Sequence, residues 1–196
     1  MKKTILLLVA LSIASGAYAK NDRDRNEITI TYGQITAPQF AYMFGGVLGA
    51  AFSLGHFSFD HALMFGSAGV EYVHYVNNWL GFGGMVLCDY MTADAYSVAS
   101  DGTKTPDGKY NLGFASAMPV VKFAWLNREH VGLYSKLACG VGYVFADQSS
   151  DPARNFTWSG QVTPIGVDFG GMSFRGFVEL GIGMQGLVSG GVRWLF

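Results

Sequence analysis

The sequence predicts an all-β protein, a single up-and-down antiparallel transmembrane β-barrel of eight strands. Three observations support this prediction. Half of the 196 residues are hydrophobic and only 14% are charged, whereas soluble domains carry roughly 25% charged residues. The apolar residues fall in alternating segments instead of the runs of about 20 that a membrane helix needs. Glycine is abundant, with 27 residues, and 13 basic against 14 acidic residues disfavour nucleic-acid binding.

The first nineteen residues have the features of a secretory signal peptide. Lys2 and Lys3 form a positive segment, residues 5–13 are apolar, and Ala17-Tyr18-Ala19 matches a cleavage site. We therefore expect a signal peptide over 1–19 and an outer-membrane β-barrel domain over 20–196. An uncleaved anchor is the alternative, although the apolar segment is too short to span a bilayer.

Segments of alternating apolar and polar residues follow, and turn-forming residues separate them. We expect strands at 27–36, 63–76, 80–97, 110–125, 131–147, 155–169, 174–185 and 187–196. Alternate connections are short (77–78, 126–130 and 170–173), and the others are mostly longer and polar, notably 100–108 and 148–154. Short periplasmic turns and long external loops are typical of outer-membrane barrels.

Charged residues predict which face of each strand points inward, because a charge on the lipid face at mid-bilayer costs about 2–4 kcal/mol. In the second strand, an inward Glu71 places His74 outside. The same rule predicts the outward residues of four later strands. They are Leu80, Phe82, Val86 and Tyr90 in the third, Val131, Leu133, Leu137, Val141, Tyr143 and Phe145 in the fifth, Phe174, Val178, Leu180, Ile182 and Met184 in the seventh, and Val188, Gly190, Val192, Trp194 and Phe196 in the eighth.

The inward charges form a balanced set near the periplasmic end, from which only Asp89 is distant. We interpret them as an ionic plug that closes the lower lumen, with plain structural filling and a conducting lumen as the alternatives. Eight strands leave little room for a water-filled pore. The residues of this set are Glu71, Asp89, Lys122, Lys136, Asp168, Arg175, Glu179 and Arg193.

The upper interior is expected to be apolar. Its large side chains face glycines such as Gly140, Gly142, Gly181 and Gly183. These side chains either interlock with the glycines or line an apolar pocket for an acyl chain or another small amphiphile, which flexible methionines suit. The candidates are Met85, Leu87, Met91, Phe114 and Met118.

The segment 38–62 lies between the first two strands, and its conformation does not follow from the pattern. Residues 38–55 are uncharged and include Gly45 and Gly49 at GxxxG spacing, which permits a short membrane helix. We expect instead a loop that carries a short helix or an extended apolar stretch at the barrel mouth. His56 and Ser58 are a weak candidate for a catalytic pair. No other catalytic residue, no metal site and no cofactor are expected.

Two further residue types fit a barrel. Cys88 and Cys139 lie on outward positions two strands apart, about 9–10 Å, which is too far for a disulfide. Trp79, Trp125 and Trp194 fall at predicted periplasmic strand ends and Trp158 near an external one. Such sorting is typical of the aromatic belts at membrane interfaces.

The leader, the eight alternating segments and the final residues 190–196 resemble small eight-stranded outer-membrane barrels of the OmpA/OmpX type, most closely the single-barrel proteins common in Bacteroides-like bacteria. In that class a last strand ending in Phe is recognised by the barrel-assembly machinery, and Val192, Trp194 and Phe196 match this assembly signal. The resemblance implies the outer membrane of a Gram-negative bacterium, with both termini periplasmic.

The residues leave alternative functions open, of which a soluble secreted β protein that binds a lipid is the third. The first is a structural, interaction or adhesion role through extracellular loops, with a closed, charge-balanced lumen. The second is an acyl-chain-binding or lipid A-modifying barrel enzyme that uses the upper lumen. The implied partners are outer-membrane lipid, the assembly machinery and a small amphiphile.

Overall fold

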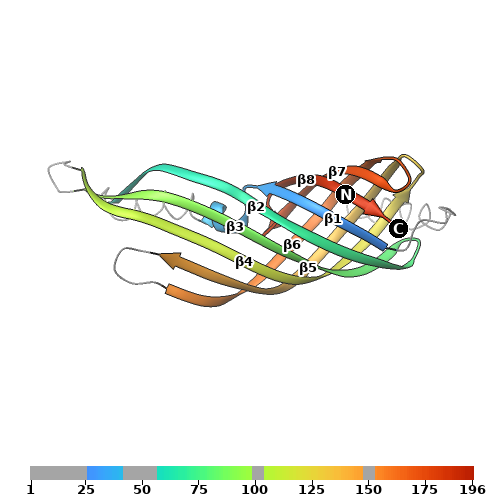
Figure 1. Ribbon diagram of the computed structural model, residues 1–196, viewed down its shortest axis with the longest axis horizontal. Coiled ribbons are helices and arrows are strands. Elements are labelled where there is room, and N and C mark those ends of the chain that lie inside the picture. The colour runs from blue at the N-terminus through green and yellow to red at the C-terminus, as the bar shows by residue number, and fades with distance from the viewer. Residues whose placement is uncertain (1–25, 42–56, 99–103, 148–152) are drawn as a thin grey trace, which may run out of the picture.

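The computed structural model of the chain is a closed antiparallel barrel of eight strands, which confirms the all-β fold (Figure 1). It describes residues 26–41, 57–98, 104–147 and 153–196, so the predicted signal peptide over 1–19 lies outside the described residues. Each strand pairs with the next, and β8 closes the ring against β1. The strands are β1 (Asn26–Gln34), β2 (Phe57–Asn77), β3 (Leu80–Val98), β4 (Lys104–Asn127), β5 (Val131–Asp147), β6 (Ala153–Gly170), β7 (Phe174–Gly183) and β8 (Val188–Leu195).

Alternating side chains give each strand one buried and one exposed face. In β1, for example, Glu27, Thr29 and Thr31 are buried, whereas Ile28 and Ile30 are exposed. Among the described residues, more of the buried side chains are polar or charged than hydrophobic, and the exposed faces carry many large apolar side chains. The barrel thus reverses the usual distribution, in which charged residues are almost never fully buried.

The strand boundaries differ from the predicted ones at several ends. β2 begins at Phe57 and β4 at Lys104, because the pairing of β2 with β3 and of β3 with β4 continues past the apolar stretches. Main-chain hydrogen bonds form such pairs whatever the side chains are. β7 ends at Gly183, whose φ of 142° turns the chain inward. Met184 is therefore 7% exposed, and its predicted outward orientation is wrong.

The barrel wall has two heights. β1, β7 and β8 contain 9, 10 and 8 residues, whereas β2 to β6 contain 17 to 24. The eight strands close the ring at the lower end, where the short turns and Phe196 lie. Beyond the pairs Gly33↔Ser67 and Gln161↔Gly183, only β2 to β6 continue as an open sheet, which we call the extension. Figure 1 shows the extension to the left of β1, β7 and β8.

Aromatic side chains lie on the outer face in two rows. The lower row includes Trp79, whose ring stacks with Phe123 at 6.3 Å, and Trp194, whose ring lies 5.1 Å from Phe196. The upper row includes Tyr90, which contacts Phe65 at 6.0 Å, and Tyr143, which contacts Phe156 at 5.2 Å. The tryptophans follow the predicted sorting, since Trp79 lies in the β2–β3 turn at the lower end, Trp125 and Trp194 lie at the lower ends of β4 and β8, and Trp158 lies in the upper part of β6.

The segment after β1 begins with a helical turn over 37–41, and β2 starts at Phe57. The intervening residues 42–56 lie outside the described part of the chain. In the described part, no helix is long and apolar enough to cross a membrane.

Candidate functional site

Charged side chains from seven strands meet in the lower half of the barrel interior, and we call them the lower cluster. Each lies at an inward position of its strand, and each is at most 3% exposed. The members are Glu27 (β1), Glu71 (β2), Lys122 (β4), Lys136 (β5), Asp168 (β6), Arg175 and Glu179 (β7), and Arg193 (β8).

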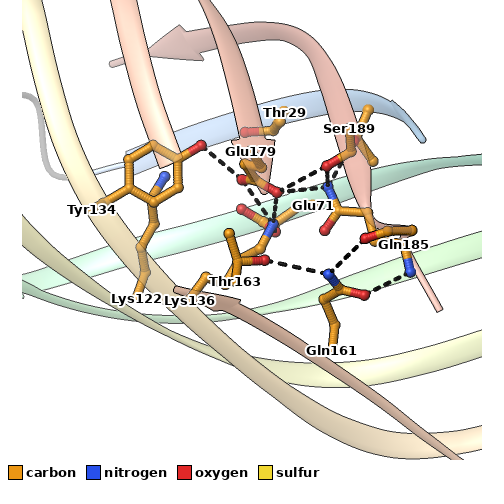
Figure 2. A network of polar contacts seen from close by, with 12 residues as sticks. Thr29, Glu71, Lys122, Tyr134, Lys136, Gln161, Thr163, Glu179, Gln185 and Ser189 are labelled. Atoms are coloured by element: carbon orange, nitrogen blue, oxygen red, sulfur yellow. Dashed lines mark hydrogen bonds and ion pairs between the residues drawn. The ribbon is translucent and has the colours of Figure 1, made fainter. Parts of the chain in front are cut away.

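The carboxylate of Glu179 is the centre of one half of the cluster (Figure 2). The Lys136 ammonium lies 2.9 and 3.0 Å from its two oxygens. The Tyr134 hydroxyl donates to it at 2.7 Å, and the Gln185 amide donates at 2.8 Å. Lys136 also donates to Glu71 at 2.8 Å. One ammonium thus joins carboxylates of β2 and β7 to β5.

The guanidinium of Arg193 is the centre of the other half. It lies 2.8 Å from Asp168 and 3.2 Å from Glu27, and it donates to the Tyr134 hydroxyl at 2.9 Å. Lys122 forms a second ion pair with Glu27. Because a guanidinium carries five donors in a planar fork, Arg193 bridges several acceptors at once. The Tyr134 hydroxyl connects the two halves of the cluster.

Arg175 closes the lower end of the interior. Its side chain pairs with Asp168 at 2.6 Å. It also donates to the carbonyl oxygens of Arg128 and Glu129 at 2.9 Å and of Gly171 at 3.1 Å. One side chain therefore fastens both the β4–β5 turn and the β6–β7 turn to the ionic network.

All eight residues of the predicted plug are buried, but the set of residues that forms the lower cluster differs from the predicted one by one residue. Glu27 was missed, although it lies on the same inward face of β1 as Thr29 and Thr31 and is 0% exposed. Asp89 is not part of the lower cluster. With Glu27 in place of Asp89, the lower cluster contains four acidic and four basic residues. The predicted neutrality therefore holds for a different set of residues.

Asp89 lies higher in the lumen, on β3, and is 6% exposed. Its carboxylate accepts hydrogen bonds from the Thr36 hydroxyl and, at 3.4 Å, from the Gln39 amide. Both donors belong to the turn after β1. Alternation within strands could not predict this contact, because Thr36 and Gln39 lie outside any strand.

The apolar candidates for the upper interior pack together. Met85, Leu87 and Met118 belong to one buried cluster, against which Phe114 packs, and Met91 is 4% exposed. Gly140, one of the glycines expected opposite these side chains, lies close to the neighbouring strand. A Cβ added at Gly140 would meet the carbonyl oxygen of Ala117 at 2.2 Å, so the neighbouring strand already occupies that space.

The arrangement offers little for catalysis. Lys136 contacts two carboxylates, which keep it in the ammonium form, whereas a nucleophilic amine must be unprotonated. Ser58 was expected in a loop but lies in β2 opposite Tyr96, and His56 lies outside the described residues. In the part of the chain that the structure describes, no three His, Cys, Asp or Glu side chains are arranged so that they could hold a metal ion together.

The remaining candidate residues lie on the outer face. Val192, Trp194 and Phe196, the residues of the expected assembly signal, are 40%, 53% and 44% exposed. Cys88 and Cys139 are unpaired and exposed, as their positions in the alternation predict.

A comparison of the chain with protein-family models finds no match, and a comparison with curated proteins finds none either.

Proposed function

We propose that this protein is a transmembrane barrel of a Gram-negative outer membrane, with a closed lumen and an interaction or adhesion role carried by its extension and external loops. The main support is the reversed polarity of the barrel, which places charges inside and apolar side chains outside. A lipid bilayer is the solvent that favours this distribution, and the closed ring leaves no unpaired strand edge in the part of the wall that it forms.

The spacing of the aromatic rows supports the same proposal. Trp79 and Tyr90 are 11 positions apart (90 − 79), and so are Trp158 and Phe169 (169 − 158). At about 3.4 Å per residue and a tilt of about 40°, this separation corresponds to roughly 28 Å. Outer-membrane barrels carry an apolar band of about 25 Å between aromatic girdles. The expected signal peptide over 1–19 would direct the chain to that compartment.

Fractionation tests the location. The full-length protein, expressed in a Gram-negative host, should sediment with the outer membrane and resist alkaline extraction. Without boiling it should migrate faster on a denaturing gel than after boiling, because a folded barrel resists the detergent. Recovery in the soluble periplasmic fraction would refute the membrane proposal.

Conductance tests the closed lumen. The lower cluster and the packed side chains above it fill the interior, as expected for eight strands. The purified protein, inserted into planar bilayers, should therefore produce no stable channels. Channels that open in most of the inserted molecules would contradict a closed lumen and leave the location unaffected.

The alternative, an acyl-chain-binding or lipid A-modifying enzyme, has less support. Met85 and Met118 are cross-strand partners in one buried apolar cluster, and Ser58 lies in a strand. The extension favours an interaction role. There β2 no longer pairs with β1, and β6 no longer pairs with β7. Unpaired strand edges are templates for pairing with another chain.

A further inference from the structure

The turn after β1 enters the barrel. β1 ends at Gln34, and the next two residues redirect the chain. Ile35 has a φ of 59°, which is a costly conformation for a β-branched residue. Thr36 and Gln39 are then 0% and 1% exposed. Thr36 and Gln39 form a local capping box, in which the Gln39 main-chain amide donates to the Thr36 hydroxyl at 3.4 Å and the Thr36 amide donates to the Gln39 side chain at 3.2 Å. This pattern favours the helical turn but not the positive φ of Ile35, so other contacts must offset the strain at Ile35.

The turn is held by a small set of hydrogen bonds. The amides of Ile35 and Thr36 donate to the Gln39 side-chain oxygen at 2.9 and 3.2 Å, and the Phe40 amide donates to the Thr36 carbonyl at 2.8 Å. These bonds shape the turn itself. In the described part of the chain, side-chain hydrogen bonds of Thr36 and Gln39 with Asp89 join the turn to the barrel wall, and the Leu187 amide adds a main-chain hydrogen bond to the Ile35 carbonyl at 3.1 Å.

Asp89 depends on the turn in return. The cations of the lower cluster pair with Glu27, Glu71, Asp168 and Glu179, and no described cation pairs with Asp89. A buried carboxylate without hydrogen-bond donors is strongly destabilised. The donors that Asp89 has come from the turn, together with its own local main chain, so Asp89 and the turn stabilise each other.

The contact between Asp89 and the turn lies next to the apolar cluster of the upper interior. On the inner face of β3, Asp89 follows Leu87 and Met85, which belong to the apolar cluster with Met118. The turn therefore lies inside the lumen, on the side of that cluster that faces the extension. We propose that Asp89 is a latch that holds the turn inside the barrel, and that release of the turn opens the apolar upper interior towards the extension. This inference does not depend on the membrane in which the barrel resides.

Methionine oxidation tests the proposal. The folded protein is treated with dilute hydrogen peroxide, and mass spectrometry follows sulfoxide formation at Met91 and Met118. Both side chains are at most 4% exposed, whereas Met172 is 63% exposed and serves as the internal reference. In Asp89→Ala, Met91 and Met118 should oxidise at least tenfold faster than in the wild type, and Met172 should oxidise at an unchanged rate.

Two further variants complete the experiment. Thr36→Val keeps the shape of Thr36 but removes the hydroxyl that donates to Asp89 and accepts from the Gln39 main-chain amide. It should therefore reproduce the faster oxidation even where Asp89→Ala folds poorly. Ser67→Ala is the control, because Ser67 is buried opposite Asp89 without a hydrogen bond to it. Ser67→Ala should behave as the wild type.

Hydrogen exchange supplies the second measurement. Both latch variants should accelerate exchange at the amides of residues 35–40 and leave the strand amides protected. Unchanged oxidation and exchange in both variants would overturn the proposal. Equal acceleration in all eight strands would overturn it too, because Asp89 would then stabilise the barrel as a whole.

Discussion

Glu71 and Glu179 share the ammonium of Lys136, yet their surroundings differ. Glu179 also accepts hydrogen bonds from Tyr134, Gln185 and Ser189. One oxygen of Glu71 has no hydrogen-bond partner. Inside a barrel the stability that a carboxylate contributes depends on the number of donors it satisfies, because unpaired donors in a low-dielectric interior cost free energy. The two residues therefore form a matched pair for measurement.

We expect Glu179→Gln to destabilise the folded barrel by about 3–5 kcal/mol, the usual cost of breaking a buried ion pair. Glu71→Gln should cost less than half as much, since Lys136 keeps Glu179 and no other donor loses its acceptor. Urea unfolding followed by tryptophan fluorescence, in vesicles of one composition, measures both. Equal losses, or a larger loss for Glu71→Gln, would contradict the assigned contacts.

At the scale of the elements, β2 and β3 approach closely beside Gly83, and this approach requires glycine there but not at the neighbouring Gly84. A Cβ at Gly83 would lie 1.8 Å from the carbonyl oxygen of Tyr72 and 2.7 Å from the Cα atom of Val73. A Cβ at Gly84 would meet only a carbonyl oxygen at 3.8 Å. Backbone atoms cannot move aside without separating the strands, so these adjacent glycines have different roles.

Gly83→Ala should therefore reduce the yield of folded barrel and lower its free energy of unfolding. Gly84→Ala should be neutral or stabilising by up to about 1 kcal/mol, because alanine restricts the unfolded chain. The unboiled gel shift and urea unfolding measure the two variants side by side. Comparable behaviour of the two variants would show that β2 and β3 do not approach as closely as described.

The outer faces of the strands allow the membrane proposal to be tested at single positions. Val86 and Met172 are 56% and 63% exposed, but Val86 lies between the aromatic rows and Met172 lies in the β6–β7 turn. Val86→Arg should cost about 2–4 kcal/mol in lipid vesicles, whereas Met172→Arg should cost close to nothing. If water surrounded both positions, both arginines would be tolerated, and equal small effects would exclude a membrane around Val86.

For the whole molecule, the closed ring and the extension are separable. The ring contains the lower cluster and the β1–β8 pairing, whereas the upper part of the β3–β4 hairpin contacts neither of these. Met91 pairs with Leu112, so an Asn-Gly turn can replace residues 92–111 and keep the register.

We expect this shortened protein to insert into vesicles and to keep its unboiled gel shift, because the interactions that close the barrel remain. The full-length protein folded in parallel is the control. Failure of the shortened chain to fold would show that the extension contributes to the stability of the ring. Loss of adhesion to a partner, with folding intact, would support an interaction role for the upper β3–β4 hairpin.

Much of the barrel could be predicted because alternation is a local property. A strand has a period of two, so one inward charge such as Glu179 or Arg193 assigns the face of its whole strand. This rule predicts the eight strands, the outward cysteines and the burial of the charged residues, and it applies equally to Glu27, which was overlooked. Alternation does not specify which acid pairs with which base, since the pairing depends on the register of several strands.

The sequence by itself determined the strand order, the two faces of each strand and the presence of buried charges, because each follows from neighbours along the chain. Only the tertiary structure decided where the strands end, how the lower cluster is connected and why Asp89 is separate from it. These features arise from contacts between distant segments, such as Thr36 with Asp89 and Arg175 with the β4–β5 turn. No local pattern encodes them, because the turn of residues 35–41 enters the lumen only when the closed ring supplies the acceptor.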